Sequence, residues 1–101
     1  MIFISLNGKE RSYLRGEANS LSPLTQIGKE GITPGVISQV EECLEDHELV
    51  KIKINDNNEI SAREAASRLS EKTDSSIVQV IGSVLVLYRE NPEIAGYNLP
   101  D

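Results

Sequence analysis

Apolar residues recur at helical spacing in three stretches of the chain. Each stretch follows a residue that caps helix N-termini well: Asn7, Thr33 and Ser61. Two of these caps have a glutamate three residues later, the spacing of a capping box, and a proline occupies the favoured first position of the middle helix. The pattern therefore predicts helices over residues 8–20, 34–47 and 62–72.

Two strand-like runs lie among these helices. Residues 24–27 are short and bounded by proline and glycine, and residues 48–54 alternate so that Lys51 and Lys53 share one face. Neighbouring lysines on a sheet repel each other, so this pair indicates either protection of a sheet edge or a site for an anion.

A hairpin is predicted near the end of the chain. The β-prone runs 76–81 and 84–88 are separated by Gly82-Ser83, and their nearly continuous apolarity predicts central or doubly covered strands. The elements therefore follow the order α-β-α-β-α-β-β. Residues 91–101 carry two prolines and a glycine without periodicity, and we expect them to form a C-terminal tail that can drape over the domain.

Between the first strand and the second helix stands a two-glycine loop, Gly28-Lys29-Glu30-Gly31. Gly28 and Gly31 let main-chain N–H groups approach a ligand closely, and the helix start just beyond presents unpaired N–H groups and a partial positive charge. The loop is therefore a candidate phosphate site. It lacks the six-residue spacing and terminal Lys-Ser/Thr of a Walker A motif, and many isolated GxxG sequences are simple turns.

Composition limits the alternatives. At 101 residues and 39% hydrophobic content the chain fits one globular domain, and its scarcity of aromatics predicts a core of Ile, Leu, Val and Ala, which suits a sheet covered by helices. The single cysteine, Cys43, excludes an intrachain disulfide and lies on the apolar face of its helix. The apolar start of the chain is too short for a membrane span, and we expect a cytoplasmic protein.

No enzyme class fits these residues. The sequence offers no nucleophile with a base, no paired carboxylates at a recognisable spacing and no metal-ligand cluster, and the single histidine, His47, stands among carboxylates near the end of a helix. We therefore expect no catalytic residues, no metal, no cofactor and no small-molecule substrate.

The net charge of −6 argues against a protein that coats nucleic acid by bulk attraction, but the acidity lies almost wholly after residue 40. Arg11 and Arg15, four residues apart, share one stripe of the first helix, where they either face solvent or point at one ligand. The acidic run Glu41 to Glu48 is either a solvated face or a surface for a basic protein. The second reading makes the chain a protein-interaction adaptor.

Several runs together resemble one known family. They are Arg11–Ala18, Gln26–Thr33, Glu48–Lys53, Val78–Gly82 and Val86–Arg89. In this order they are similar to the CRM-domain family, which includes the small bacterial YhbY-like proteins. The likeness covers residues 8–90, leaving residues 1–7 as an N-terminal extension.

The resemblance implies a single compact α/β domain with a four-stranded mixed sheet, similar to the C-terminal domain of bacterial translation initiation factor three. It also implies a non-catalytic RNA-binding protein that associates with the precursor of the large ribosomal subunit, with ribosomal proteins as further partners. Carried over by position, the RNA-contacting loop is Gly28, Lys29, Glu30 and Gly31. Charge adds Arg11, Arg15, Lys51, Lys53 and Arg89.

Two residues depart from the family pattern. Glu30 puts a carboxylate where a small or neutral residue is common, and it repels phosphate unless it faces away. Ser83 stands in the hairpin where relatives often carry a basic residue.

Overall fold

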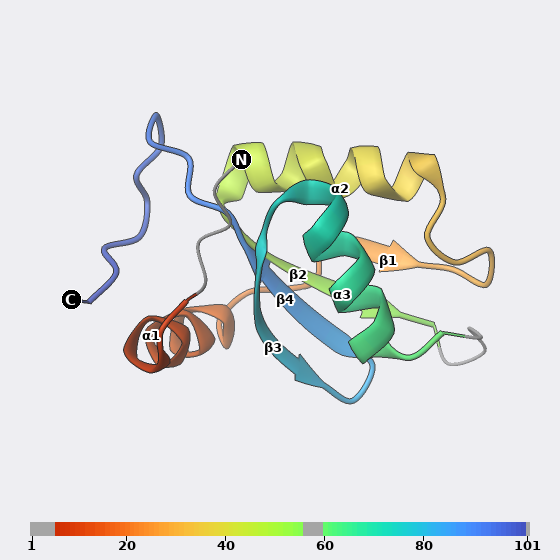
Figure 1. Ribbon diagram of the computed structural model, residues 1–101, viewed down its shortest axis with the longest axis horizontal. Helices are drawn as coiled ribbons and strands as arrows, with labels where there is room; N and C mark the ends of the chain where they lie inside the picture. Colours follow the sequence, from red (N-terminus) through yellow and green to blue (C-terminus); the bar gives the residue numbers. More distant parts are fainter. Residues whose placement is uncertain (1–5, 56–59, 101) are drawn as a thin grey trace.

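The computed structural model describes residues 6–55 and 60–100, and within these ranges its elements follow the predicted order (Figure 1). They are α1 (Gly8–Ala18), β1 (Thr25–Ile27), α2 (Pro34–His47), β2 (Leu49–Ile54), α3 (Ala62–Thr73), β3 (Ser76–Ile81) and β4 (Val84–Tyr88). All three helices begin where predicted, because the side chains of Asn7, Thr33 and Ser61 each accept a hydrogen bond from a first-turn amide. The first helix is shorter than expected and ends before residue 20.

The described strands form one four-stranded mixed sheet, as expected from the resemblance, and their order in it is β1-β2-β4-β3. The β1–β2 pair is parallel, and the other two pairs are antiparallel. The prediction of two central or doubly covered hairpin strands holds for β4 but fails at the end of β3, where Ile81 is 63% exposed. The apolarity of β3 has another cause: Ile77 and Val80 pack on one core cluster and Val78 belongs to the other.

The larger part of the core lies between the sheet and the helices α2 and α3 (Figure 1). Val50 and Ile52 of β2 and Leu85 and Leu87 of β4 are fully buried on this face. Small residues of α3 let the helix lie close to the strands. The two helices therefore cover this face of the sheet.

The opposite face is covered only in part. There α1 packs Leu14 and Ala18 against Leu49, Val86 and Tyr88. The C-terminal segment joins this second cluster through Tyr97 and Leu99, as the expected drape of the tail requires. The rings of Tyr88 and Tyr97 meet edge to face, with centroids 6.3 Å apart. Burial and, secondarily, the charge of Glu48 raise the pKa of Tyr88 to about 12.

Glu48 connects α2, β2 and the C-terminal segment. It has a positive φ of 64° and its side chain is buried at 1% exposure. Its carboxylate accepts hydrogen bonds from the backbone amides of Asn91 at 2.8 Å and Gly96 at 2.7 Å, while its carbonyl oxygen accepts from the Arg89 amide. A Cβ at position 96 would lie 3.1 Å from the carboxylate, which explains the glycine there. Glu48 is therefore not part of a solvated acidic face.

Replacing Glu48 with alanine should lower the free energy of unfolding by about 2–4 kcal/mol, because the backbone amides of Asn91 and Gly96 lose a buried charged acceptor. Urea unfolding measures the loss, and hydrogen exchange at Asn91 and Gly96 should accelerate. The matched control is Glu42→Ala on the exposed side of α2, for which we expect a change below about 0.5 kcal/mol. Equal stability of the two variants would contradict the structural role of Glu48.

Candidate nucleic-acid interface

The two-glycine loop joins the end of β1 to the start of α2 (Figure 1). The Gly31 amide donates to the Gly28 carbonyl oxygen at 3.0 Å, which closes a tight turn with Lys29 and Glu30 at its tip. Gly31 has a φ of +77°, a conformation that side chains disfavour. Lys29 and Glu30 are exposed, and neither has an ionic partner within the described ranges. The loop therefore presents one free cation and one free anion.

The N-terminus of α2 opens beside this turn. The Thr33 side chain accepts from the Val36 amide at 3.2 Å, and the Thr33 carbonyl oxygen accepts from the Ile37 amide. Pro34 has no N–H, and in the described part of the chain the Gly35 amide has no acceptor. The turn and the first residues of α2 line a hollow of about 240 Å³. An anion there would meet Lys29 and the positive end of the helix dipole.

The end of β2 and the β3–β4 hairpin lie at the same end of the sheet as this loop. The side chains of Gln26 and Asn55 are hydrogen bonded, and the Asn55 amide donates to the carbonyl oxygen of Ile27 at 3.0 Å. The Ile54 amide donates to the Ser83 carbonyl oxygen at 2.8 Å. The loop is thus fixed against the sheet by backbone contacts on its β1 side.

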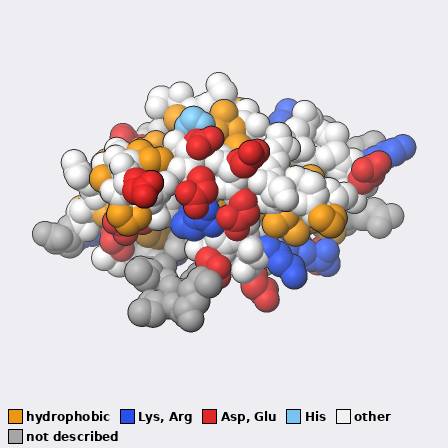
Figure 2. Space-filling model, turned by 90° about the horizontal axis from the view of Figure 1, so that it is seen from above, with side chains coloured by type: hydrophobic (Ala, Val, Ile, Leu, Met, Phe, Trp, Pro, Cys, Tyr) orange, Lys and Arg blue, Asp and Glu red, His pale blue; other side chains and the backbone are white. Residues whose placement is uncertain are grey.

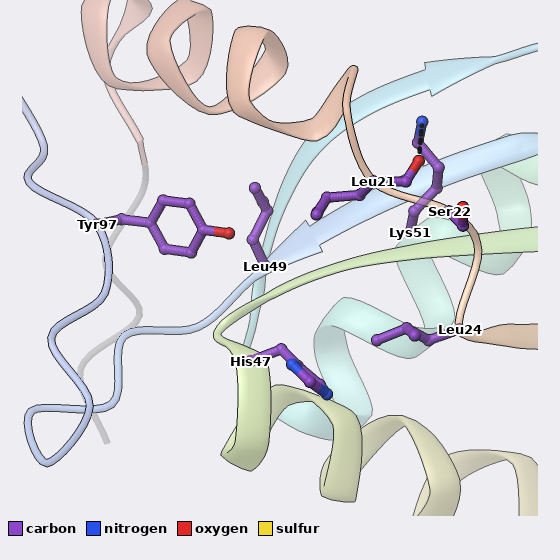
Figure 3. Close-up of a pocket in the computed structure, with 7 residues that line it drawn as sticks. All are labelled: Leu21, Ser22, Leu24, His47, Leu49, Lys51 and Tyr97. Carbon is purple, nitrogen blue, oxygen red and sulfur yellow. Dashed lines mark hydrogen bonds between the residues drawn. The ribbon is translucent and has the colours of Figure 1, made fainter.

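Lys51 and Lys53 share the partly covered face of the sheet, on the side of β2 that also carries Leu49. Because β2 lies between β1 and β4, protection of a sheet edge does not explain them. Lys53 is exposed and has no ionic partner among the residues that the structure describes. Lys51 is half-buried and its ammonium donates to the Leu21 carbonyl oxygen at 3.1 Å, the dashed line in Figure 3.

A second hollow, also about 240 Å³, lies beside Lys51 (Figure 3). The tail supplies Tyr97, α2 supplies His47, and the connection from α1 to β1 supplies Leu21 and Leu24. The tail's contribution could not be anticipated, because residues 91–101 show no periodicity.

The two arginines of α1 are not brought to the loop. Arg11 and Arg15 are both exposed, but the Arg11 guanidinium donates to the Ile77 carbonyl oxygen at 3.4 Å, at the start of β3. The two-glycine loop lies at the other end of the sheet, where β3 ends. A ligand that touches both Arg11 and the two-glycine loop must therefore extend from one end of the sheet to the other.

Arg89 lies in an acidic setting away from the loop. Its guanidinium contacts the carboxylates of Glu41 at 2.9 Å and Glu45 at 3.2 Å, and it donates to the Thr73 carbonyl oxygen at 2.8 Å. Figure 2, viewed onto α2, shows acidic side chains gathered around a basic one in the middle of this face, with further Lys and Arg side chains toward its right-hand end. These contacts tie α2, α3 and the end of β4 together, which is a structural role for Arg89.

The described residues show neither a metal centre nor a membrane span. No group of three or more His, Cys, Asp or Glu side chains comes together within residues 6–55 and 60–100. Over the same ranges, every helix is too short or too polar to cross a bilayer.

Comparisons with known proteins find relatives that are named for RNA binding. The chain is 38% identical over 95 residues to "Probable RNA-binding protein YqeI" of Bacillus subtilis, covering 94% of this chain and 99% of that one. It is 34% identical over 89 residues to an RNA-binding protein of Haemophilus influenzae, covering 88% and 90%. These relatives are named for binding RNA and not for catalysis.

A solved structure has the same fold. The solution structure of a hypothetical protein from Staphylococcus aureus superposes with a TM-score of 0.81 at 45% sequence identity, over 94% of this chain and 99% of that one. The family model for the CRS1/YhbY (CRM) domain matches residues 6–89. The chain belongs to the CRS1/YhbY (CRM) domain family.

Proposed function

We propose that this protein binds RNA without catalysis and that the two-glycine loop holds the RNA backbone. The observation that carries the proposal is the exposed turn with Lys29 at its tip, set against the free amide of Gly35 at the start of α2. Phosphate is the RNA group that such a cradle suits, because it is anionic and accepts several hydrogen bonds. The names of the relatives support RNA as the partner.

The RNA we propose is ribosomal, within the precursor of the large subunit in the cytoplasm, where the protein assists assembly. The resemblance to YhbY-like proteins supports this setting. A net charge of −6 disfavours nonspecific coating of RNA, because the protein as a whole repels phosphate. Binding at one local basic surface, to one place on a folded ribosomal precursor, fits this charge better.

The adaptor alternative has less support. It requires the acidic run from Glu41 to Glu48 to be free for a basic protein. Glu41 and Glu45 already contact Arg89, and the Glu48 carboxylate is buried against two backbone amides. A partner would have to displace these contacts, so we favour RNA.

Replacing Lys29 with alanine should weaken binding to structured ribosomal RNA about fivefold at low salt, the effect of one exposed ion pair of about 1 kcal/mol. A plot of the logarithm of the binding constant against that of salt concentration should also flatten by about 0.7–0.9, the value for one phosphate contact. Fluorescence anisotropy measures both quantities. Lys72→Ala, which removes an exposed lysine from the last turn of α3, is the matched control. Identical behaviour of the two variants would remove the loop from the interface.

Replacing Glu30 with glutamine should strengthen the same binding by up to about fivefold at low salt, because it removes a carboxylate that lines the hollow. The gain should shrink as salt rises, since exposed charges are screened. The control is Glu42→Gln, which makes the same net-charge change on α2. If both variants gain equally, the effect belongs to net charge and not to the loop.

In cell extract, the protein should co-sediment with the large ribosomal subunit or its precursor. Lys29→Ala should reduce the co-sedimenting fraction, because it removes a phosphate contact, and Lys72→Ala should leave it unchanged. Sucrose-gradient fractionation with immunodetection measures both. If the wild-type protein sediments only as a free small protein, the ribosomal part of the proposal is refuted. RNA binding itself would then be tested by the anisotropy titrations alone.

A further inference from the structure

The partly covered face of the sheet carries one transverse row of side chains next to the two-glycine loop. The strand register aligns them across all four strands of the described sheet: Gln26, Lys53, Val84 and Ile81. Gln26 stands two residues before Gly28, so this row begins where the loop begins. With about 4.8 Å between strands, the row is about 14 Å long.

A second row runs parallel to the first. Lys51 is in register with Val86 and Val86 with Gln79, while the Leu24 amide donates to the Lys51 carbonyl oxygen at 3.0 Å. Asn19, the C-cap of α1, completes a hollow of about 250 Å³ over both rows. The two rows therefore share one open depression beside α1.

The first row is less covered by the rest of the described chain than the third row is, and the second row is intermediate because its Val86 is buried under α1. In that third row, Leu49 and Tyr88 are buried under α1 and the tail. By contrast, Ile81 is 63% exposed and Leu24 is 47% exposed, and both lie on or beside the open rows. A ligand that covers these large exposed apolar side chains would gain binding free energy by removing their surface from water.

The chemistry of the two rows is mixed. Lys53 is a free cation within the described ranges, and the aligned positions of both rows hold no Asp or Glu. Gln26, Gln79 and Asn19 add amides that both donate and accept hydrogen bonds. Apolar side chains therefore lie next to cationic and amide groups on this surface, unlike the charge-depleted core of a protein–protein interface.

We infer that this face is a platform for single-stranded RNA that continues from the two-glycine loop. The inference rests on the proposed function and specifies its substrate class. In a single strand the base faces are free to lie on Ile81 and Val84, the phosphates meet Lys53, and the amides of Gln26 and Gln79 meet base edges. A duplex keeps its base faces stacked inside and would use only the lysines.

The loop, the first row and the hollow follow one another along the surface, so one continuous RNA strand could contact them in turn. RNA held at the loop reaches the row of Gln26 and Lys53 first, and the hollow beside Lys51 and Gln79 next. The ammonium of Lys51 is held by the Leu21 carbonyl oxygen (Figure 3), and Lys51 also lines the hollow that contains Gln79. Only a few nucleotides fit, so the platform suits a loop or a single-stranded end of a folded RNA.

The test compares a short single-stranded oligoribonucleotide with the same strand annealed to its complement. Ile81→Ser should weaken binding of the single strand about fivefold, because a base lying on Ile81 covers apolar surface worth about 1 kcal/mol, and leave the duplex unchanged. Lys53→Ala should flatten the salt dependence for the single strand by about 0.7. Ile94→Ser, which truncates another exposed apolar side chain, and Lys72→Ala are the matched controls.

A second measurement avoids variants altogether. In NMR titrations of the wild-type protein, backbone amide signals of Gln79, Ile81 and Val84 should shift with the single strand and not with the duplex. If Lys29→Ala weakens binding but Ile81→Ser does not, or if the duplex binds as tightly as the single strand, the platform is refuted and the loop survives. If Lys29→Ala has no effect while Ile81→Ser and Lys53→Ala do, the loop is refuted and the platform survives. Absence of any RNA binding refutes both.

Discussion

The parallel pairing of β1 with β2 is the constraint on which the site depends. Parallel neighbours cannot be joined by a tight turn, so the chain must cross back over the sheet, and it does so through α2. The crossover forces the start of α2 to lie at the edge of the sheet where β1 ends. The two-glycine loop is the connection that makes this step, and its position beside a helix N-terminus is a consequence of topology.

The strand β1 is short, and its few residues have different environments on the two faces of the sheet. Only Thr25, Gln26 and Ile27 pair with β2, and of these Thr25 and Ile27 are buried. Gln26 is left on the other face, exposed and hydrogen bonded to Asn55. One strand of three residues thus fixes the loop, anchors it to the core and contributes to the open face at the same time.

Local signals in the sequence were sufficient for the elements and for the loop. The caps Asn7, Thr33 and Ser61 and the Gly82-Ser83 turn act over a few residues, so their outcome could be predicted. The edge position of β3 could not be predicted, because the periodicity of a strand shows how many of its faces are buried and not which strands lie beside it.

Charged residues were harder still to interpret from sequence. Arg89 and Glu48 looked like free charges, yet each is satisfied by groups more than ten positions away, Arg89 by Glu41, Glu45 and Thr73 and Glu48 by Asn91 and Gly96. A list of basic residues therefore does not show which of them are engaged within the fold. The residues that the list omitted, Gln26, Gln79 and Ile81, are uncharged, and only the strand register brings them into line with Lys53.

The contacts of the buried Glu48 carboxylate extend beyond the residues that the family model matches. The family match ends at residue 89, but two amides beyond that point complete the hydrogen bonding of a side chain at the centre of the fold, and Tyr97 and Leu99 complete its second cluster. The module that the family model matches thus ends before the contacts that complete this part of the fold. A protein cut at the module boundary would keep every residue of the loop and lose part of the scaffold that holds the sheet in place.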